Sequence, residues 1–182
     1  MTICKYFIGF LALCFMGCSS MRPQDFNSVT PRFIPEEYFQ GASKGQGVFY
    51  DRFGNVKARF VAELNGQWNG TVLTLNEVLT YDWGEKVQRT YTFTKKSEHL
   101  YEVTAPDLVG PGTVESYGNT LRWRYKLRQK IGKSFWTLSF NDWMFLQQDG
   151  VVLNRAYASK FGIGLGEVFM AVTKVNATYV AN

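Results

Sequence analysis

Leu121-Arg-Trp-Arg-Tyr-Lys-Leu-Arg-Gln-Lys130 is the stretch that decides the fold of this 182-residue chain. Every even position in it carries Lys or Arg, whereas the odd positions up to Leu127 carry apolar or aromatic side chains. Successive side chains of a β-strand point to opposite faces, so this alternation predicts a strand with one dry face and one wet face.

The period of two extends over most of the chain on both sides of this stretch. Residues 56–64 alternate in the same way, and residues 87–95 are rich in side chains that favour strands. Turn signals such as Asn69-Gly70 and Asp149-Gly150 separate the alternating segments. The pattern predicts nine or ten strands, at residues 44–52, 55–65, 70–81, 86–95, 98–105, 112–117, 119–131, 134–147, 151–159 and 166–176.

Many short strands joined by tight turns indicate an all-β fold, an antiparallel meander. Closing the sheet removes its exposed edges, so we expect a barrel of about eight to ten strands. Such a barrel either holds a small ligand or fills its interior with side chains. A transmembrane barrel is the competing interpretation, but it would crowd five basic side chains of residues 121–130 into its lumen.

The first 17 residues differ in character from the rest. Lys5 is their only charge, and the apolar run from Tyr6 to Met16 has 11 residues, whereas a membrane-spanning helix needs about 20. A positive start, a short apolar run and small residues after it are typical of a secretory signal, which we place at residues 1–17.

Phe15-Met16-Gly17-Cys18 resembles the lipobox of bacterial lipoproteins. The resemblance implies cleavage before Cys18 and acyl chains on that cysteine, which would hold the protein on a membrane. Ser19 follows where an Asp would favour the inner membrane, so the same resemblance implies the outer membrane, with the protein facing the periplasm. An ordinary secretory signal that happens to contain a cysteine is the alternative.

The mature chain divides into a tether and one domain. Residues 18–34 are polar and contain Pro23 and Pro31, so we expect a flexible lipidated tether. Residues 35–182 form the single barrel domain, which starts with one helical turn at residues 35–39.

The inventory of catalytic residues is thin. Cys18 is the only cysteine left after the predicted cleavage, and His99 is the only histidine, expected on a strand surface. We therefore expect no metal site, no cofactor and no catalytic residue, and neither a Gly-x-Ser-x-Gly motif nor a P-loop is present. A periplasmic location excludes nucleic acid as a partner.

Two carboxyl groups, Glu77 and Asp142, stand among apolar neighbours. Burial of a carboxylate is costly without a partner, so they predict either structural ion pairs or a polar anchor for a ligand or a reaction. Aromatic side chains on the alternating strands would line a cavity. The candidate ligand-binding residues are Trp68, Glu77, Arg89, Tyr91, Trp123, Tyr125, Asp142 and Arg155.

The basic side chains of residues 121–130 would share one face of their strand. Such a face is either an ordinary solvated surface or a contact for anionic lipid head groups. The candidate contact residues are Arg122, Arg124, Lys126, Arg128 and Lys130.

Several motifs together resemble the bacterial lipoproteins of domain-of-unknown-function family 3833. The resemblance implies a lipocalin-like barrel and hints at envelope lipid metabolism, but it implies no particular activity. Asp82-Trp83-Gly84 departs from the family pattern, in which Asp and Gly are adjacent. The matching motifs include Asp51-Arg52-Phe53-Gly54, Gly66-Gln67-Trp68, Leu75-Asn76-Glu77, Asp107-Leu108-Val109-Gly110, Gly118-Asn119, Trp123-Arg124-Tyr125, Asp142-Trp143-Met144, Asn154-Arg155-Ala156 and Lys160-Phe161-Gly162.

The sequence leaves three functions open. The first is a membrane-anchored lipoprotein that binds a lipid or another hydrophobic small molecule inside its barrel. The second is a structural or assembly partner in the cell envelope with no small ligand. The third is an enzyme that acts on lipid or glycan through Glu77 or Asp142.

The lipobox generates the first testable prediction. Replacing the acyl acceptor in Cys18→Ala should abolish incorporation of labelled palmitate and move the protein out of the membrane fraction, because the acyl chains supply the anchor. Cys14→Ala, inside the predicted signal, is the matched control and should keep both label and location. Palmitate labelling that persists in Cys18→Ala would contradict the assignment.

Overall fold

The computed structural model describes residues 21–175, so the predicted signal and Cys18 lie outside the described part. No helix within residues 21–175 is long and apolar enough to cross a membrane. Two short helices, η2 (Pro23–Phe26) and α2 (Pro35–Tyr38), precede ten strands. The strands are β1 (Gly41–Asp51), β2 (Val56–Trp68), β3 (Val72–Tyr81), β4 (Lys86–Lys95), β5 (Leu100–Thr104), β6 (Gly112–Tyr117), β7 (Thr120–Ile131), β8 (Ser134–Leu146), β9 (Val152–Lys160) and β10 (Ile163–Lys174).

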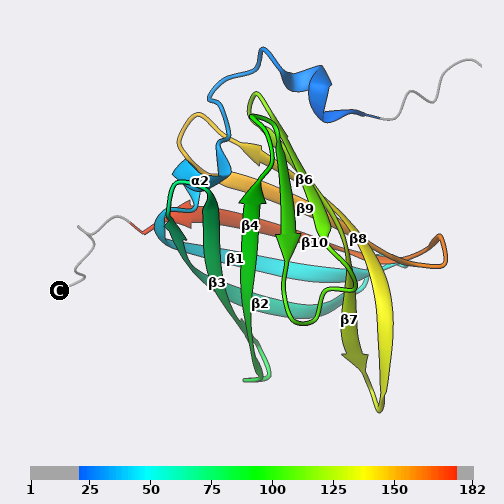
Figure 1. Cartoon of the computed structure of the whole chain (residues 1–182). Helices are drawn as coiled ribbons and strands as arrows, with labels where there is room; N and C mark the ends of the chain where they lie inside the picture. Colours follow the sequence, from blue (N-terminus) through cyan, green and yellow to red (C-terminus); the bar gives the residue numbers. More distant parts are fainter. Residues whose placement is uncertain (1–20, 176–182) are drawn as a thin grey trace, which may run out of the picture.

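The strands form one closed antiparallel barrel in which each strand pairs with its neighbours in sequence and β10 returns to pair with β1 (Figure 1). The predicted all-β barrel and its ten strands are therefore confirmed, with ends that shift by a few residues. One such shift is at β10, which begins at Ile163 and continues past a bulge between Gly164 and Gly166. Gly162, Gly164 and Gly166 therefore belong to the β9–β10 turn and to the irregular start of β10.

The antiparallel order sorts the turns between two ends of the barrel. Turns after the odd-numbered strands lie at one end, which we call the open end; the others lie at the opposite, closed end, where α2 packs. Inward side chains near the closed end form the core. It includes Leu73, Leu75, Tyr91, Phe93, Tyr101, Val103, Val114, Leu121, Trp123, Met144, Leu146, Val152 and Val172.

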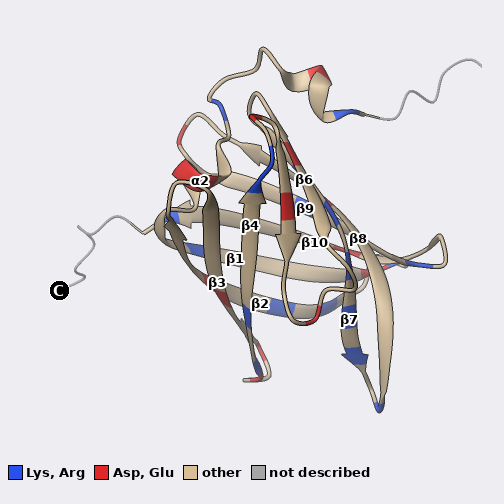
Figure 2. Cartoon of the chain, in the orientation of Figure 1, with Lys and Arg blue, Asp and Glu red and all other residues tan. Residues whose placement is uncertain are grey.

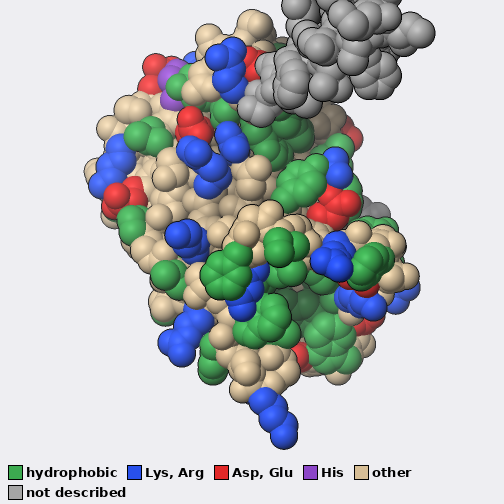
Figure 3. Space-filling model, turned by 90° about the vertical axis from the view of Figure 1, so that its right-hand side faces the viewer, with side chains coloured by type: hydrophobic (Ala, Val, Ile, Leu, Met, Phe, Trp, Pro, Cys, Tyr) green, Lys and Arg blue, Asp and Glu red, His purple; other side chains and the backbone are tan. Residues whose placement is uncertain are grey.

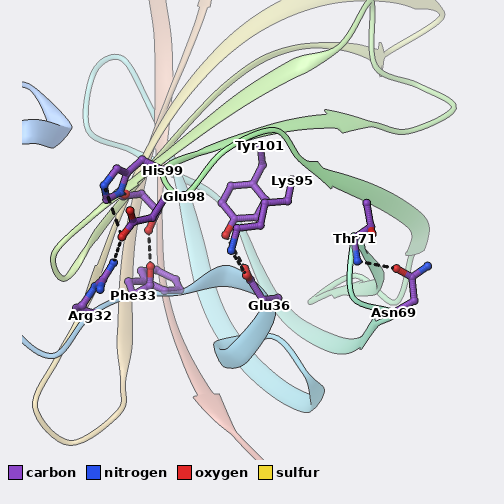
Figure 4. Close-up of polar contacts among 10 residues, drawn as sticks. Arg32, Phe33, Glu36, Asn69, Thr71, Lys95, Glu98, His99 and Tyr101 are labelled. Carbon is purple, nitrogen blue, oxygen red and sulfur yellow. Dashed lines mark hydrogen bonds and ion pairs between the residues drawn. The ribbon is translucent and has the colours of Figure 1, made fainter.

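Three aromatic side chains seal the closed end. Phe33, Tyr38 and Phe39 are all at most 8% exposed, and the Phe33 ring lies 5.2 Å from Tyr38 and 5.9 Å from Phe39, centroid to centroid. The backbone N–H of Phe33 donates to Gly118 O at 2.7 Å, and Ser116 Oγ donates to Phe33 O (Figure 4). These bonds fix the segment before α2 across the β6–β7 turn.

A buried carboxylate completes the seal. Glu36 accepts hydrogen bonds from Lys95 Nζ on β4 and Tyr101 Oη on β5, each at 2.5 Å (Figure 4). Burial by itself would raise the pKa of Glu36, but these two bonds outweigh it and hold the pKa below its ordinary value. Helix α2 is thus bonded to the barrel wall as well as packed on the core.

The segment before α2 differs from the expected tether. Pro23–Phe26 form a 3-10 helix, and Phe26 packs against Trp143 and Phe145 on the outer wall of β8, with ring centroids 6.5 and 5.5 Å away. The expectation of a flexible segment is therefore wrong for residues 21–34. The physical reason is that Phe26 and Phe33 each find an apolar surface, which a composition dominated by polar residues conceals.

His99 lies in the β4–β5 turn rather than on a strand. Its Nδ1 is 2.8 Å from Ser116 O, and its ring stacks on Tyr117 with centroids 4.1 Å apart. Both contacts are structural, since they join two turns of the closed end.

The seal predicts a large effect of one substitution. Phe33→Ala removes a side chain that is 1% exposed and should lower the free energy of unfolding by about 3–5 kcal/mol, measured by urea denaturation. The matched control is Phe161→Ala at a 92% exposed position, which should change it by no more than about 0.5 kcal/mol. Equal losses of unfolding free energy in the two variants would contradict the conclusion that Phe33 seals the closed end.

Candidate functional site

The interior toward the open end differs from the core. Many inward side chains of this half are partly exposed, although Ala58, Leu127, Leu138 and Ala158 are buried. The partly exposed ones include Phe49, Phe60, Leu79, Tyr81, Phe140, Val168 and Met170. Aromatic rings dominate its wall, and Tyr125 stacks on Phe140 with centroids 5.1 Å apart at an interplanar angle of 7°. We call these partly exposed, mainly apolar side chains the mouth of the barrel.

A cluster of charged side chains lies below this mouth. Arg89 on β4 donates from Nε and Nη2 to Asp107, with the shortest distance 2.7 Å, and from Nη1 to Glu77 on β3 at 3.4 Å. Arg89 Nη1 also donates to Tyr91 Oη at 2.9 Å. Glu77 and Arg89 are cross-strand partners, and their side chains are 13% and 8% exposed. Glu77 therefore takes part in a buried ion pair, one of the two alternatives that the sequence left open.

Asp107 reaches this cluster from the β5–β6 turn. The turn lies against β7, where Arg128 N donates to Asp107 O and Val109 N donates to Lys126 O, both at 2.8 Å. These two bonds hold the turn over the barrel, and the Asp107 carboxylate points back to Arg89. The role of Asp107 could not be predicted from the sequence, because nothing in the turn residues indicates that this loop folds inward.

The second part of the interior is nearly free of cations. Asp142 on β8 is the register partner of Trp123 on β7, and its Oδ2 accepts a hydrogen bond from Tyr125 Oη at 3.4 Å. It is 5% exposed and makes no ion pair among the described residues. Tyr91 and Trp123 connect the two parts, with ring centroids 4.9 Å apart.

The acids of the interior have raised pKa values. For Asp142, burial is the main cause, and the nearby Glu77 adds to it, while the Tyr125 hydrogen bond acts in the opposite direction. For Glu77, burial also raises the pKa, although Arg89 and Tyr91 partly oppose it. Both acids face the same interior, since Glu77 lies opposite buried Leu64 and Asp142 lies opposite buried Trp123.

Several buried polar atoms inside the barrel have no hydrogen-bond partner in the described part of the protein. They include Asp142 Oδ1, Trp123 Nε1 and Asn154 Nδ2. These atoms belong to neighbouring strands, since Trp123 pairs with Asp142 and Asn154 lies on β9 beside β8. One acceptor and two donors are thus free to bind a polar group, which is unusual because buried polar atoms are nearly always paired.

The candidate residues from the sequence fall into two groups. Six lie in the connected interior: Glu77, Arg89, Tyr91, Trp123, Tyr125 and Asp142. Trp68 is half-buried near the closed end and packs against the core, away from the mouth.

Arg155 was expected to be a candidate interior partner, but it lies on the outer wall. Its Nε donates to Glu167 at 2.8 Å, and its guanidinium lies over Phe169. The reason is the register of β9, where Asn154 and Ala156 are buried and Arg155 faces outward.

The basic side chains of β7 face outward, and Figure 2 shows Lys and Arg along this strand. Arg122 lies over Trp143, 4.9 Å from its ring centroid, and Arg124 pairs with Glu115 at 3.0 Å. Lys126, Arg128 and Lys130 are exposed. Within the described structure, neighbouring side chains therefore engage Arg122 and Arg124. Lys126 and Lys130, nearer the open end, are available for other contacts.

A separate groove of about 790 Å³ crosses the outer wall of β8, β9, β10, β1 and β2. Its outward side chains are mainly apolar, among them Val61, Phe145, Leu153 and Phe169. This groove could not be predicted from the sequence, because its lining comes from strands that are far apart in the chain.

The buried Asp142 predicts a pH dependence of stability. Its raised folded pKa means that the folded protein keeps a proton which the unfolded chain releases near 3.8, so stability falls as pH rises above that value. Asp142→Asn should therefore gain stability relative to the parent as pH rises from about 4 to 7 and show little difference at lower pH, measured by thermal unfolding. Glu63→Gln, on the exposed face of β2, is the control. An Asp142→Asn variant whose stability relative to the parent does not change with pH would contradict the burial argument.

Comparison with known proteins agrees with this geometry. No curated protein matches the sequence. Among solved structures, the S-type phycobiliprotein lyase CPES from Guillardia theta is similar, with a TM-score of 0.58 and 7% identity over 78% of this chain and 90% of that chain. At this identity the likeness shows a shared lipocalin-like barrel fold. A family model described as "Protein of unknown function (DUF3833)" matches residues 12–174, and the chain therefore belongs to that family.

Proposed function

We propose that the protein is a lipoprotein anchored to the outer membrane through Cys18, facing the periplasm, which binds a lipid or another hydrophobic small molecule inside its barrel. The main support is the set of unpaired buried atoms Asp142 Oδ1, Trp123 Nε1 and Asn154 Nδ2. They offer hydrogen bonds to a polar head group, while the aromatic mouth offers apolar contact to the rest of the molecule.

The charges of the interior favour a neutral head group. Glu77, Asp107 and Asp142 supply three carboxyl groups, whereas Arg89 supplies the cation that binds two of them. A carboxylate or phosphate head would bring further negative charge into this buried acidic site, which is unfavourable. A hydroxyl or amide group can both donate and accept hydrogen bonds without adding charge, so a neutral lipid with such a head group fits best.

The outer groove supports a second candidate, an envelope protein partner that binds without any small ligand. Its apolar lining is the observation in favour, since exposed apolar patches mark interaction sites on soluble proteins. The two sites can be separated by substitution, because one lies inside the barrel and the other outside it.

The proposal predicts that filling the interior blocks binding. Val168→Trp places a large ring on the inner face of β10, and it should weaken binding of the fluorescent probe N-phenylnaphthylamine at least about tenfold, or about 1.4 kcal/mol. Leu153→Trp, in the outer groove, is the matched control and should leave the affinity unchanged. Both proteins are first compared by thermal unfolding, so that loss of fold is separated from loss of binding.

Co-purifying molecules identify the ligand class. The chain from Ser19 onward contains every described residue and can be expressed without acyl chains. Mass spectrometry of its organic extract should show a neutral lipid that is depleted in Val168→Trp. Binding lost in Leu153→Trp but kept in Val168→Trp would place the site in the outer groove and contradict the proposal.

A further inference from the structure

The turns at the open end expose large apolar side chains at their tips. Phe53 in the β1–β2 turn is 75% exposed, Trp83 in the β3–β4 turn 56%, and Phe161 in the β9–β10 turn 92%. Exposed apolar residues also occur in the β5–β6 and β7–β8 turns or directly beside them. Together these side chains form what we call the rim: Phe53, Trp83, Val109, Ile131, Phe135, Phe161 and Ile163.

The turns at the closed end have a different composition. They read Asn69-Gly70-Thr71, Lys96-Ser97-Glu98-His99, Gly118-Asn119 and Gln147-Gln148-Asp149-Gly150-Val151. None of these turns carries Phe, Trp, Leu or Ile, and their side chains bind neighbouring backbone or charges, as Asn69 and Glu98 do. Apolar exposure at turn tips is thus a property of the open end rather than of turns in general.

Three rim aromatics carry a cation against the ring. The guanidinium of Arg52 lies 4.7 Å from the centroid of Phe53, and that of Arg128 lies 4.7 Å from the centroid of Phe135. Lys160 Nζ lies 5.3 Å from the centroid of Phe161 and 3.6 Å from that of Trp136. Each pair presents an apolar ring and a positive charge to the same side of the molecule.

Further charge at the open end is mostly positive. Lys130 and Lys133 stand at the tip of the β7–β8 hairpin, which continues the exposed part of the basic face of β7. The acids Asp82 and Glu85 in the β3–β4 turn are each engaged locally, by Arg59 and by the indole N–H of Trp83. Figure 3, which shows the side toward which the β9–β10 hairpin extends in Figure 1, has hydrophobic side chains interspersed with Lys and Arg.

Rings and cations arranged in this way match the interface of an anionic bilayer. Aromatic and aliphatic side chains enter the head-group region, where amphipathic rings are favoured, while Lys and Arg meet the lipid phosphates. A protein partner with one matching surface would have to contact tips on five separate turns, whereas a fluid surface adapts to all of them.

We propose that the rim docks onto an anionic phospholipid bilayer, so that the mouth of the barrel opens against the lipid surface. The inference stands on the rim alone, and it holds whether or not the interior binds a ligand. It is also separate from the acyl anchor, since residues 21–34 pack at the closed end, opposite the rim, so the bilayer at the rim is not the one that would hold Cys18.

The test uses the chain from Ser19 onward, which has no acyl chains. It should co-sediment with phosphatidylcholine vesicles that contain about one quarter phosphatidylglycerol, bind pure phosphatidylcholine vesicles more weakly, and lose affinity as salt is added. Brominated acyl chains should quench the fluorescence of Trp83, and the quenched component should disappear in Trp83→Phe, which retains binding.

Substitutions at the rim should weaken binding without unfolding the protein. Phe53→Ser combined with Phe161→Ser should reduce vesicle affinity at least about tenfold, because both rings leave the lipid interface. Leu153→Ser combined with Tyr157→Ser removes exposed apolar side chains from the outer wall and should bind like the parent. Lys130→Gln combined with Lys133→Gln should weaken binding to the anionic vesicles only.

Two results would overturn the inference. The first is parental vesicle affinity in the Phe53→Ser, Phe161→Ser variant. The second is a dimer of the parent protein, detected by sedimentation in the absence of lipid, that becomes monomeric in this variant, since the rim would then be covered by a second copy of the chain.

Discussion

The hydrogen-bond ladder between β1 and β10 is the constraint on which the rest of the structure depends. It runs from Ser43 opposite Lys174 to Asp51 opposite Gly166 and joins the first strand to the last. Without it, both strands would present unpaired edges, and the inward side chains would face water on one side. With it, alternation along each strand becomes a division between an enclosed interior and an outer wall.

The sequence carried most of the architecture because alternation is a local signal. Ten strands, the helical turn before Gly41 and the outward direction of the basic side chains of β7 all derive from the period of two or from turn residues. An ion pair at Glu77 was also accessible as one alternative, because a buried carboxylate needs a cation, although the choice of Arg89 was not. Features that are determined by one residue and its near neighbours could therefore be predicted.

Features that depend on register or on long-range packing could not be predicted from the sequence. Arg155 and Asn154 are adjacent in sequence, yet one faces the outer groove and the other the interior, and only the β8–β9 register decides which. Asp107 enters the site because its turn is bonded to β7, and Phe26 packs on β8 because its segment crosses the outer wall. The amino-acid composition of these two segments does not distinguish them from ordinary loops.

The ladder between the terminal strands also affects how the chain folds. More than a hundred residues separate Ser43 from Lys174, so these contacts have high contact order and form slowly. The edge of β1 is covered only when β10 has formed. The polypeptide therefore cannot complete its native structure while its C-terminal part is still being made. Until then the edge of β1 stays unpaired and open to pairing with other chains.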